Sequence, residues 1–202
     1  MPDNTQKMLE FLRTEVITLE LYWHMFRQLY DAGPEVANLL HETAGIFFGG
    51  LRIMSLDNIV LRITKLTDPA KQGKYENAAL YSLVAEIDPN NGLWSEINSK
   101  LKVLSNTCVR LRDIRDKIVS HHDAKTKLGK STIASAPKKD FEDAIQLSKD
   151  VFNMACKALV IDEKYHLHEV VYQGTADELL RRLRESEKYR ELISSGKIPY
   201  DS

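Results

Sequence analysis

The sequence contains few cysteines, few residues that break helices, and little net charge. Its 202 residues include two cysteines, nine glycines and six prolines, and its formal net charge at pH 7 is −1. Two thiols are too few for a disulfide framework or a thiolate metal site. Because a protein without disulfides is typical of a reducing compartment, we expect this chain in the cytoplasm. A net charge near zero provides no bulk positive field, so binding of RNA would need a local basic cluster.

A long uninterrupted apolar run is also missing. The N-terminus, MPDNTQKMLEFL, carries charges where a signal peptide would be apolar. The longest apolar stretches are interrupted by Arg, Asp or His within a few residues. A membrane-spanning helix needs about 20 predominantly apolar residues, so we expect no segment of this chain to cross a membrane.

Apolar residues recur at spacings of three and four along most of the chain, which predicts an all-α fold, an up-and-down helical bundle. The expected helices cover residues 5–31, 35–67, 77–87, 93–121 and 138–160. The pair Gly49-Gly50 lies inside the second of them, which indicates either a close contact with another helix or a kink. Residues 123–137 have no periodicity and predict an exposed loop.

The pattern changes after about Ile161, which divides the chain into a bundle over residues 1–160 and a C-terminal appendage over residues 161–202 that packs on the same domain. The segment beginning at Tyr165 predicts a short strand or an extended linker. Thr175 and Glu178 then have the spacing of a capping box and predict the start of a last helix.

The most densely charged stretch is R-D-I-R-D-K-I-V-S-H-H-D, residues 112–123, at the expected end of the helix over 93–121. At about 100° per residue, Arg115 and His122 lie within about 20° of one face, whereas His121 is rotated by about 100° from His122. A histidine can transfer protons at neutral pH, and the arginine fork suits a phosphate. Together they suit RNA cleavage by an internal 2′-hydroxyl without a metal. Spacing alone favours the simpler interpretation of a solvated helix end.

Residues 115–121, R-D-K-I-V-S-H, resemble the signature of the HEPN superfamily, in which an Arg and usually a polar residue precede a His after four to six intervening positions. Here Asp116 takes the polar place, and five residues separate Arg115 from His121 and six separate it from His122. The wider string around the motif and I-V-L-R-I-T-K-L-T-D-P, residues 59–69, resemble the abortive-infection AbiU branch. The resemblance covers about residues 5–159.

This resemblance implies a helical bundle that dimerises, with the two Arg–His motifs facing each other across a cleft. It also implies a metal-independent endoribonuclease that acts as a toxin or antiphage effector. Arg115 would bind the scissile phosphate, His121 would be the acid/base group or phosphate ligand, and Asp116 would position them. The usual spacing in this branch favours His121, whereas the helical wheel favours His122. No cofactor and no metal are expected, and the expected partners are RNA, a second copy, and an antitoxin or other partner protein.

Basic residues near the motif are the further candidates for RNA binding. Arg112 and Lys117 belong to the motif stretch, and Lys125 and Lys127 follow it. A soluble flexible loop is the simpler interpretation of the last two, because the segment has no aromatic residues on which bases could stack. Some HEPN proteins are not nucleases, so the alternative function is a non-catalytic module that binds a partner protein or a nucleotide. A plain helical scaffold is the third interpretation.

Overall fold

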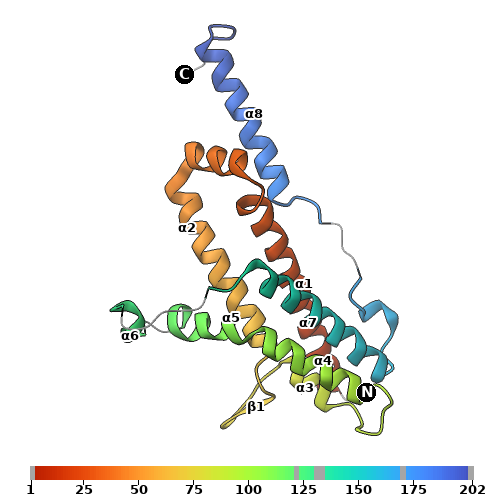
Figure 1. The fold of residues 1–202 in the computed structure, drawn as a ribbon. Helices are drawn as coiled ribbons and strands as arrows, with labels where there is room; N and C mark the ends of the chain where they lie inside the picture. The colour runs from red at the N-terminus through yellow and green to blue at the C-terminus, as the bar shows by residue number, and fades with distance from the viewer. Residues whose placement is uncertain (1–2, 121–122, 130–134, 169–171, 200–202) are drawn as a thin grey trace. The chain divides into compact units, whose positions relative to one another are not determined.

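The computed structural model describes residues 3–120, 123–129, 135–168 and 172–199. Within these residues the chain forms eight α-helices, a π-helical turn, a 3-10 turn and a small two-stranded sheet (Figure 1). The predicted all-α helical bundle is therefore confirmed.

The two strands lie between the second and third helices. In chain order the elements are α1 (Asp3–Tyr30), α2 (Pro34–Leu66), β1 (Lys71–Gln72), β2 (Tyr75–Glu76), α3 (Leu80–Ala85), α4 (Trp94–Thr107), α5 (Val109–Ile114), a π turn (Arg115–Val119), α6 (Ala124–Lys127), α7 (Lys138–Ala158), a 3-10 turn (Glu163–Tyr165) and α8 (Ala176–Ser194). The strands are antiparallel, with Lys71 opposite Glu76. The first two helices agree with the ranges that the sequence predicts to within two residues.

The chain divides into two compact units. Unit 1 comprises residues 1–20 and 57–169, and unit 2 comprises residues 21–56 and 170–202. The division expected after residue 160 stays a prediction.

Unit 1 has its core between the start of α1, the end of α2, and helices α3, α4, α5 and α7. Helices α4 and α7 lie side by side and make the most extensive helix–helix contact (Figure 1). The buried positions of α7 recur every three or four residues, which is why one face of this helix is apolar. The largest side chains fully buried in this core are Leu9, Leu12, Leu19, Ile59, Ile63, Leu80, Leu83, Ile97, Leu101, Leu104, Leu111 and Phe152.

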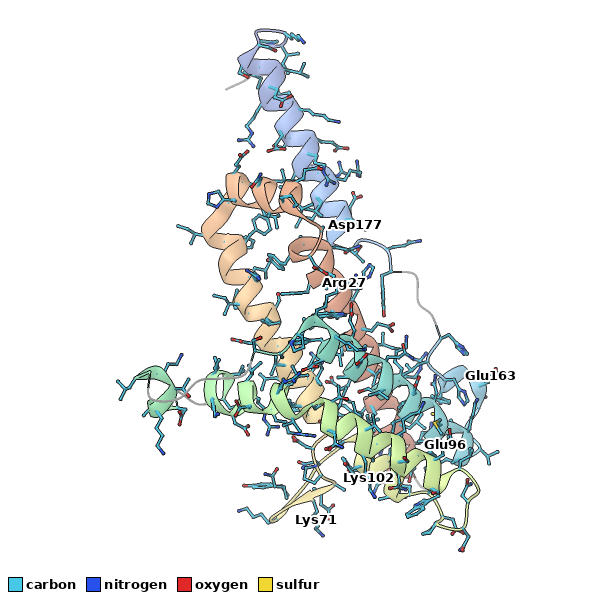
Figure 2. The ribbon with its side chains drawn as sticks, viewed as in Figure 1. Arg27, Lys71, Glu96, Lys102, Glu163 and Asp177 are labelled. Atoms are coloured by element: carbon cyan, nitrogen blue, oxygen red, sulfur yellow. The ribbon has the colours of Figure 1, made fainter. Side chains whose placement is uncertain are left out.

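Unit 2 has a smaller core between the end of α1, the first part of α2 and the start of α8. Its buried members are Leu29, Val36, Leu39, Leu40, Phe48, Ala176 and Leu180. Gln28 Nε2 on α1 donates hydrogen bonds to Asp177 Oδ2 at 2.5 Å and to Thr175 Oγ1 at 3.2 Å. Figure 2 labels Asp177 in the first turn of α8. These bonds fix the start of α8 within unit 2.

Helix α2 bends at Ala44, where φ is −161° and ψ is 67°. The predicted glycine pair lies five residues further on, and a Cβ added at Gly49 or at Gly50 would meet no atom within 4 Å. The expected close helix contact at these glycines is therefore not made among the described residues, and the bend lies before them.

Three further local expectations were wrong. The helix expected over residues 93–121 is interrupted at Cys108 (φ −81°, ψ 0°) and ends in a π turn. The loop expected after residue 123 begins with α6, because the Asp123 carboxylate caps that helix and accepts the N–H of Thr126 at 2.8 Å. The last helix does begin directly after Thr175, as expected, but the capping bond from the Thr175 side chain is not made, and its hydroxyl accepts from Gln28 Nε2.

Helix α2 is also the one described helix whose length and composition would allow it to cross a membrane. A core helix of a soluble protein passes the same test, so this is weak evidence. The expectation that no segment crosses a membrane stays a prediction.

Candidate functional site

Arg115, the first residue of the π turn, is held between two carboxylates of unit 1. Its Nη1 donates to Asp68 Oδ1 at 3.0 Å, and its Nε donates to Asp116 Oδ1 at 2.7 Å. The Arg115 and Asp68 side chains are 21% and 22% exposed, whereas that of Asp116 is 59% exposed. Among the described residues, Nη2 of Arg115 has no hydrogen-bond partner.

The charge of Arg115 is stabilised by this arrangement. Burial lowers the pKa of the guanidinium, but the hydrogen bonds and charges of Asp116 and Asp68 outweigh burial, and the pKa is raised from its ordinary value. The guanidinium therefore stays charged across the physiological pH range. A permanently charged fork with one unoccupied amino group can bind an oxygen of a phosphate.

Arg112, one turn before Arg115, is held by backbone and hydroxyl oxygens. Its Nη2 donates to the carbonyl oxygen of Thr67 at 2.9 Å and to Thr67 Oγ1 at 2.7 Å. Its Nη1 donates to the carbonyl oxygen of Ser105 at 2.9 Å and to Ser105 Oγ at 3.3 Å. Both amino groups are thus used within unit 1, so Arg112 joins the end of α2 to α4.

The Thr67-Asp68-Pro69 segment explains how α2 reaches the motif. Helix α2 ends at Leu66, and the last carbonyl groups of a helix lack partners within the helix. The positive charge of Arg112 at this end satisfies the Thr67 carbonyl and suits the helix dipole. Pro69 disfavours a helical conformation at Asp68, and the Pro69 carbonyl accepts from Asn77 Nδ2 at 2.7 Å. Consecutive residues of one helix end therefore hold two arginines of the motif.

The backbone of the motif forms a π turn in which the N–H of Ser120 donates to the carbonyl oxygen of Arg115 at 2.7 Å. A bond that spans five residues spreads one turn over more residues, so the rotation per residue falls below 100°. The helical wheel that favours His122 over His121 therefore does not apply here. Both histidines lie outside the described residues. Single π turns occur frequently at functional sites.

The remaining basic candidates do not contact Arg115 among the described residues. Lys117 Nζ lies 2.7 Å from Asp113 Oδ1, one turn earlier on the same segment. Lys125 and Lys127 are exposed on α6 and form no ion pair with the described part of the chain.

The described residues also contain no group of three or more His, Cys, Asp or Glu side chains arranged to hold a metal ion.

The comparison with protein families agrees with this arrangement. The family model described as HEPN AbiU2 matches residues 2–179, which include every residue named in this site. The chain belongs to the AbiU2 family of HEPN proteins. No curated protein and no solved structure gives a significant match. The match confirms the resemblance drawn from the Arg–His motif and the T-D-P string, and it assigns this AbiU2 chain to the abortive-infection HEPN domains.

Sequence reasoning found Arg115 in this AbiU2 chain but gave no role to Thr67 and Asp68. The T-D-P string contributes to the sequence prediction only as part of the resemblance, and Asp68 lies 47 positions from the arginine that it binds. The sequence signal that could have drawn attention to Asp68 is the Pro that follows this acidic residue at a predicted helix end.

Proposed function

We propose that this AbiU2-family protein is a metal-independent endoribonuclease that acts on RNA as a homodimer. The observation that carries the proposal is the fixed position and permanent charge of the Arg115 guanidinium. This arginine is mostly buried, remains charged, is fixed by Asp68 and Asp116, and has no partner for Nη2 among the described residues. Such a group binds a phosphate strongly because its orientation is fixed before the substrate arrives.

In the proposed reaction, Nη2 of Arg115 binds a non-bridging oxygen of the scissile phosphate. His121 removes the proton from the ribose 2′-hydroxyl or returns one to the leaving 5′-oxygen, since an imidazole exchanges protons near neutral pH. The 2′-oxygen bonds to phosphorus as the bond to the 5′-oxygen breaks, leaving a 2′,3′-cyclic phosphate. Asp116 holds Nε of Arg115, and His122 is the second choice for the acid/base group.

The test is cleavage of an RNA pool in the presence of EDTA. We expect Arg115→Ala and His121→Ala each to abolish cleavage while circular dichroism and unfolding remain close to those of the wild type. The matched control is Arg110→Ala, which removes an exposed arginine (52%) of α5 that pairs with Asp140. Cleavage at the wild-type rate by either site variant, or no cleavage by wild type on any RNA pool, contradicts the proposal.

Dimerisation is supported by an apolar stripe on α2. Ile46, Phe47, Ile53 and Met54 are each between 62% and 97% exposed in unit 2. Ile46 and Ile53 are seven residues apart, as are Phe47 and Met54, and Gly50 lies between the two pairs. Seven residues are about two helical turns, so the four side chains share one side of the helix after the bend. Four such side chains expose on the order of 500 Å² per copy, so two copies bury about 1,000 Å², which a specific interface requires.

Light scattering with size-exclusion chromatography tests the dimer. We expect a dimer for wild type, a monomer for Ile53→Glu, and a dimer for the control Val103→Glu, whose exposed valine (51%) lies on α4 in unit 1. A monomeric wild type, or an Ile53→Glu variant that stays dimeric, would reject this surface.

A non-catalytic binding module is the second candidate, and the charge balance favours it. Arg112, Arg115 and Lys117 carry three positive charges, and Asp68, Asp113 and Asp116 carry three negative charges in the same cluster. Such a balanced cluster attracts RNA weakly at long range. This candidate predicts that Arg115→Ala weakens capture of a partner and that wild type shows no RNA cleavage.

A further inference from the structure

A small pocket lies directly beside the Asp68–Arg115 pair. It belongs to unit 1 and has a volume of about 290 Å³. Asp68 is part of its wall, as are Phe11, Glu15, Lys65 and Asn77. Asp68 therefore connects the arginine to the pocket, because its Oδ1 accepts from Arg115 Nη1 and its side chain also lines the pocket. A ligand in this pocket would be a close neighbour of a phosphate bound by Arg115.

The size and one wall of the pocket suit a single aromatic ring. A volume of about 290 Å³ is at the small end of ligand sites, which suits one nucleobase better than a larger ligand. Phe11 on α1 leaves 48% of its surface exposed although it borders the pocket. An exposed ring at the edge of a pocket is a surface on which a base can stack.

The polar groups of the wall are mostly hydrogen-bond acceptors. Asn77 donates one Nδ2 hydrogen to the Pro69 carbonyl, so its Oδ1 and its second Nδ2 hydrogen are left to bind a ligand. Asp68 has used Oδ1 for Arg115, and Glu15 has used Oε2 for Arg62 Nη1 at 2.8 Å, which leaves one oxygen of each carboxylate.

The cationic donor in the wall is Lys65. Its ammonium group is exposed near the end of α2 and has no partner among the residues that the structure describes. The lining thus offers several acceptors and one cationic donor.

We propose that this pocket binds a guanine base of the RNA next to the phosphate held by Arg115, an inference that rests on the proposed function. The Watson–Crick edge of guanine carries two neighbouring donors, N1–H and the N2 amino group, and one acceptor, O6. The donors match the carboxylate and amide oxygens of Asp68, Glu15 or Asn77, and O6 matches Lys65. Adenine and cytosine would direct a ring-nitrogen acceptor at these oxygens, and uracil carries a single donor between two acceptors.

Binding of free nucleotides tests the pocket without requiring cleavage. We expect guanosine 5′-monophosphate to bind about tenfold more tightly than the adenosine, cytidine and uridine monophosphates in calorimetry. Inosine monophosphate, which lacks the N2 amino group, should lose most of that preference. Four equal affinities, or no measurable binding of any nucleotide at millimolar concentration, would overturn the inference.

Two variants link this preference to the pocket. Phe11→Ala removes the stacking surface and Lys65→Ala removes the donor, and we expect each to weaken guanosine monophosphate binding by about tenfold. The control is Tyr189→Ala, which removes an equally exposed aromatic ring (49%) on α8 in unit 2 and should leave binding unchanged. Unchanged affinity in both pocket variants would also overturn the inference.

A cleavage assay then separates this inference from the proposed function. On an RNA with one guanine among uridines, wild type should cut at the guanine, and Phe11→Ala should lose that preference. If guanosine monophosphate binds as expected but no RNA is cut, the pocket is upheld and the ribonuclease proposal fails. If RNA is cut without regard to guanine, the ribonuclease proposal stands and the guanine pocket is rejected.

Discussion

Removing the Arg112 guanidinium should destabilise the fold of unit 1. The side chain donates four hydrogen bonds to Thr67 and Ser105, and Thr67 is only 1% exposed. Hydrogen bonds to a charged group contribute about 1.5–3 kcal/mol, and a buried acceptor left without a partner costs about 1–3 kcal/mol. Because the two effects overlap at the Thr67 carbonyl, we expect Arg112→Ala to lower the free energy of unfolding by about 3 kcal/mol.

Arg112→Lys should lose about 1–2 kcal/mol, because an ammonium group keeps the charge but lacks the fork that reaches both partners. Urea unfolding followed by circular dichroism measures these changes. Arg110→Ala is the control, since the Arg110 side chain is 52% exposed and an ion pair made by a solvent-exposed arginine contributes at most about 1 kcal/mol. An Arg112→Ala protein as stable as Arg110→Ala would refute the reasoning. Full stability with weakened RNA binding would favour the sequence prediction of Arg112 as an RNA ligand.

Three further predictions concern buried or capping groups. Burial raises the pKa of the Cys108 thiol to about 11 and that of Cys156 to about 12, so neither should react with iodoacetamide at pH 8 until urea unfolds the protein. Hydrogen bonds from Thr126 lower the pKa of Asp123. This cap therefore stabilises α6 fully when the pH is above the ordinary carboxyl pKa, and the stabilisation is lost as the pH falls through the lowered pKa. An NMR titration that gives Asp123 an ordinary pKa would contradict this. Asp68→Asn should reduce RNA cleavage at least tenfold through kcat, with Asp57→Asn in α2 as an unaffected control. An equal rate in both variants argues against positioning by Asp68.

The long helices could be predicted because their apolar spacing is regular and their ends carry strong signals. Gly33-Pro34 and Asp68-Pro69 stop α1 and α2 where expected. The interruption at Cys108 and the π turn after Ile114 have no comparable signal, because their residues fit a continuous α-helix equally well. Such departures come from tertiary contacts, which local propensity does not contain.

The candidate site could be predicted in part. Arg115 and Asp116 were found because the motif is contiguous, and the structure joins them by a hydrogen bond. Asp68 could not be paired with Arg115 from spacing, since the contact depends on how the end of α2 packs in unit 1. The exposed lysines of α6 have the composition of a loop, and only the Asp123 cap distinguishes the helix that carries them.

The turn over Arg115–Val119 has a consequence for how the motif varies among related chains. A π turn holds one residue more than an α-helical turn, so deleting a residue there would restore the α-helix and shorten it by only about 1.5 Å. A chain with one residue fewer between Arg and His can therefore present its histidine in the same direction as a longer chain. A range of four to six intervening residues between the Arg and the His is then compatible with differences in the local winding of the backbone.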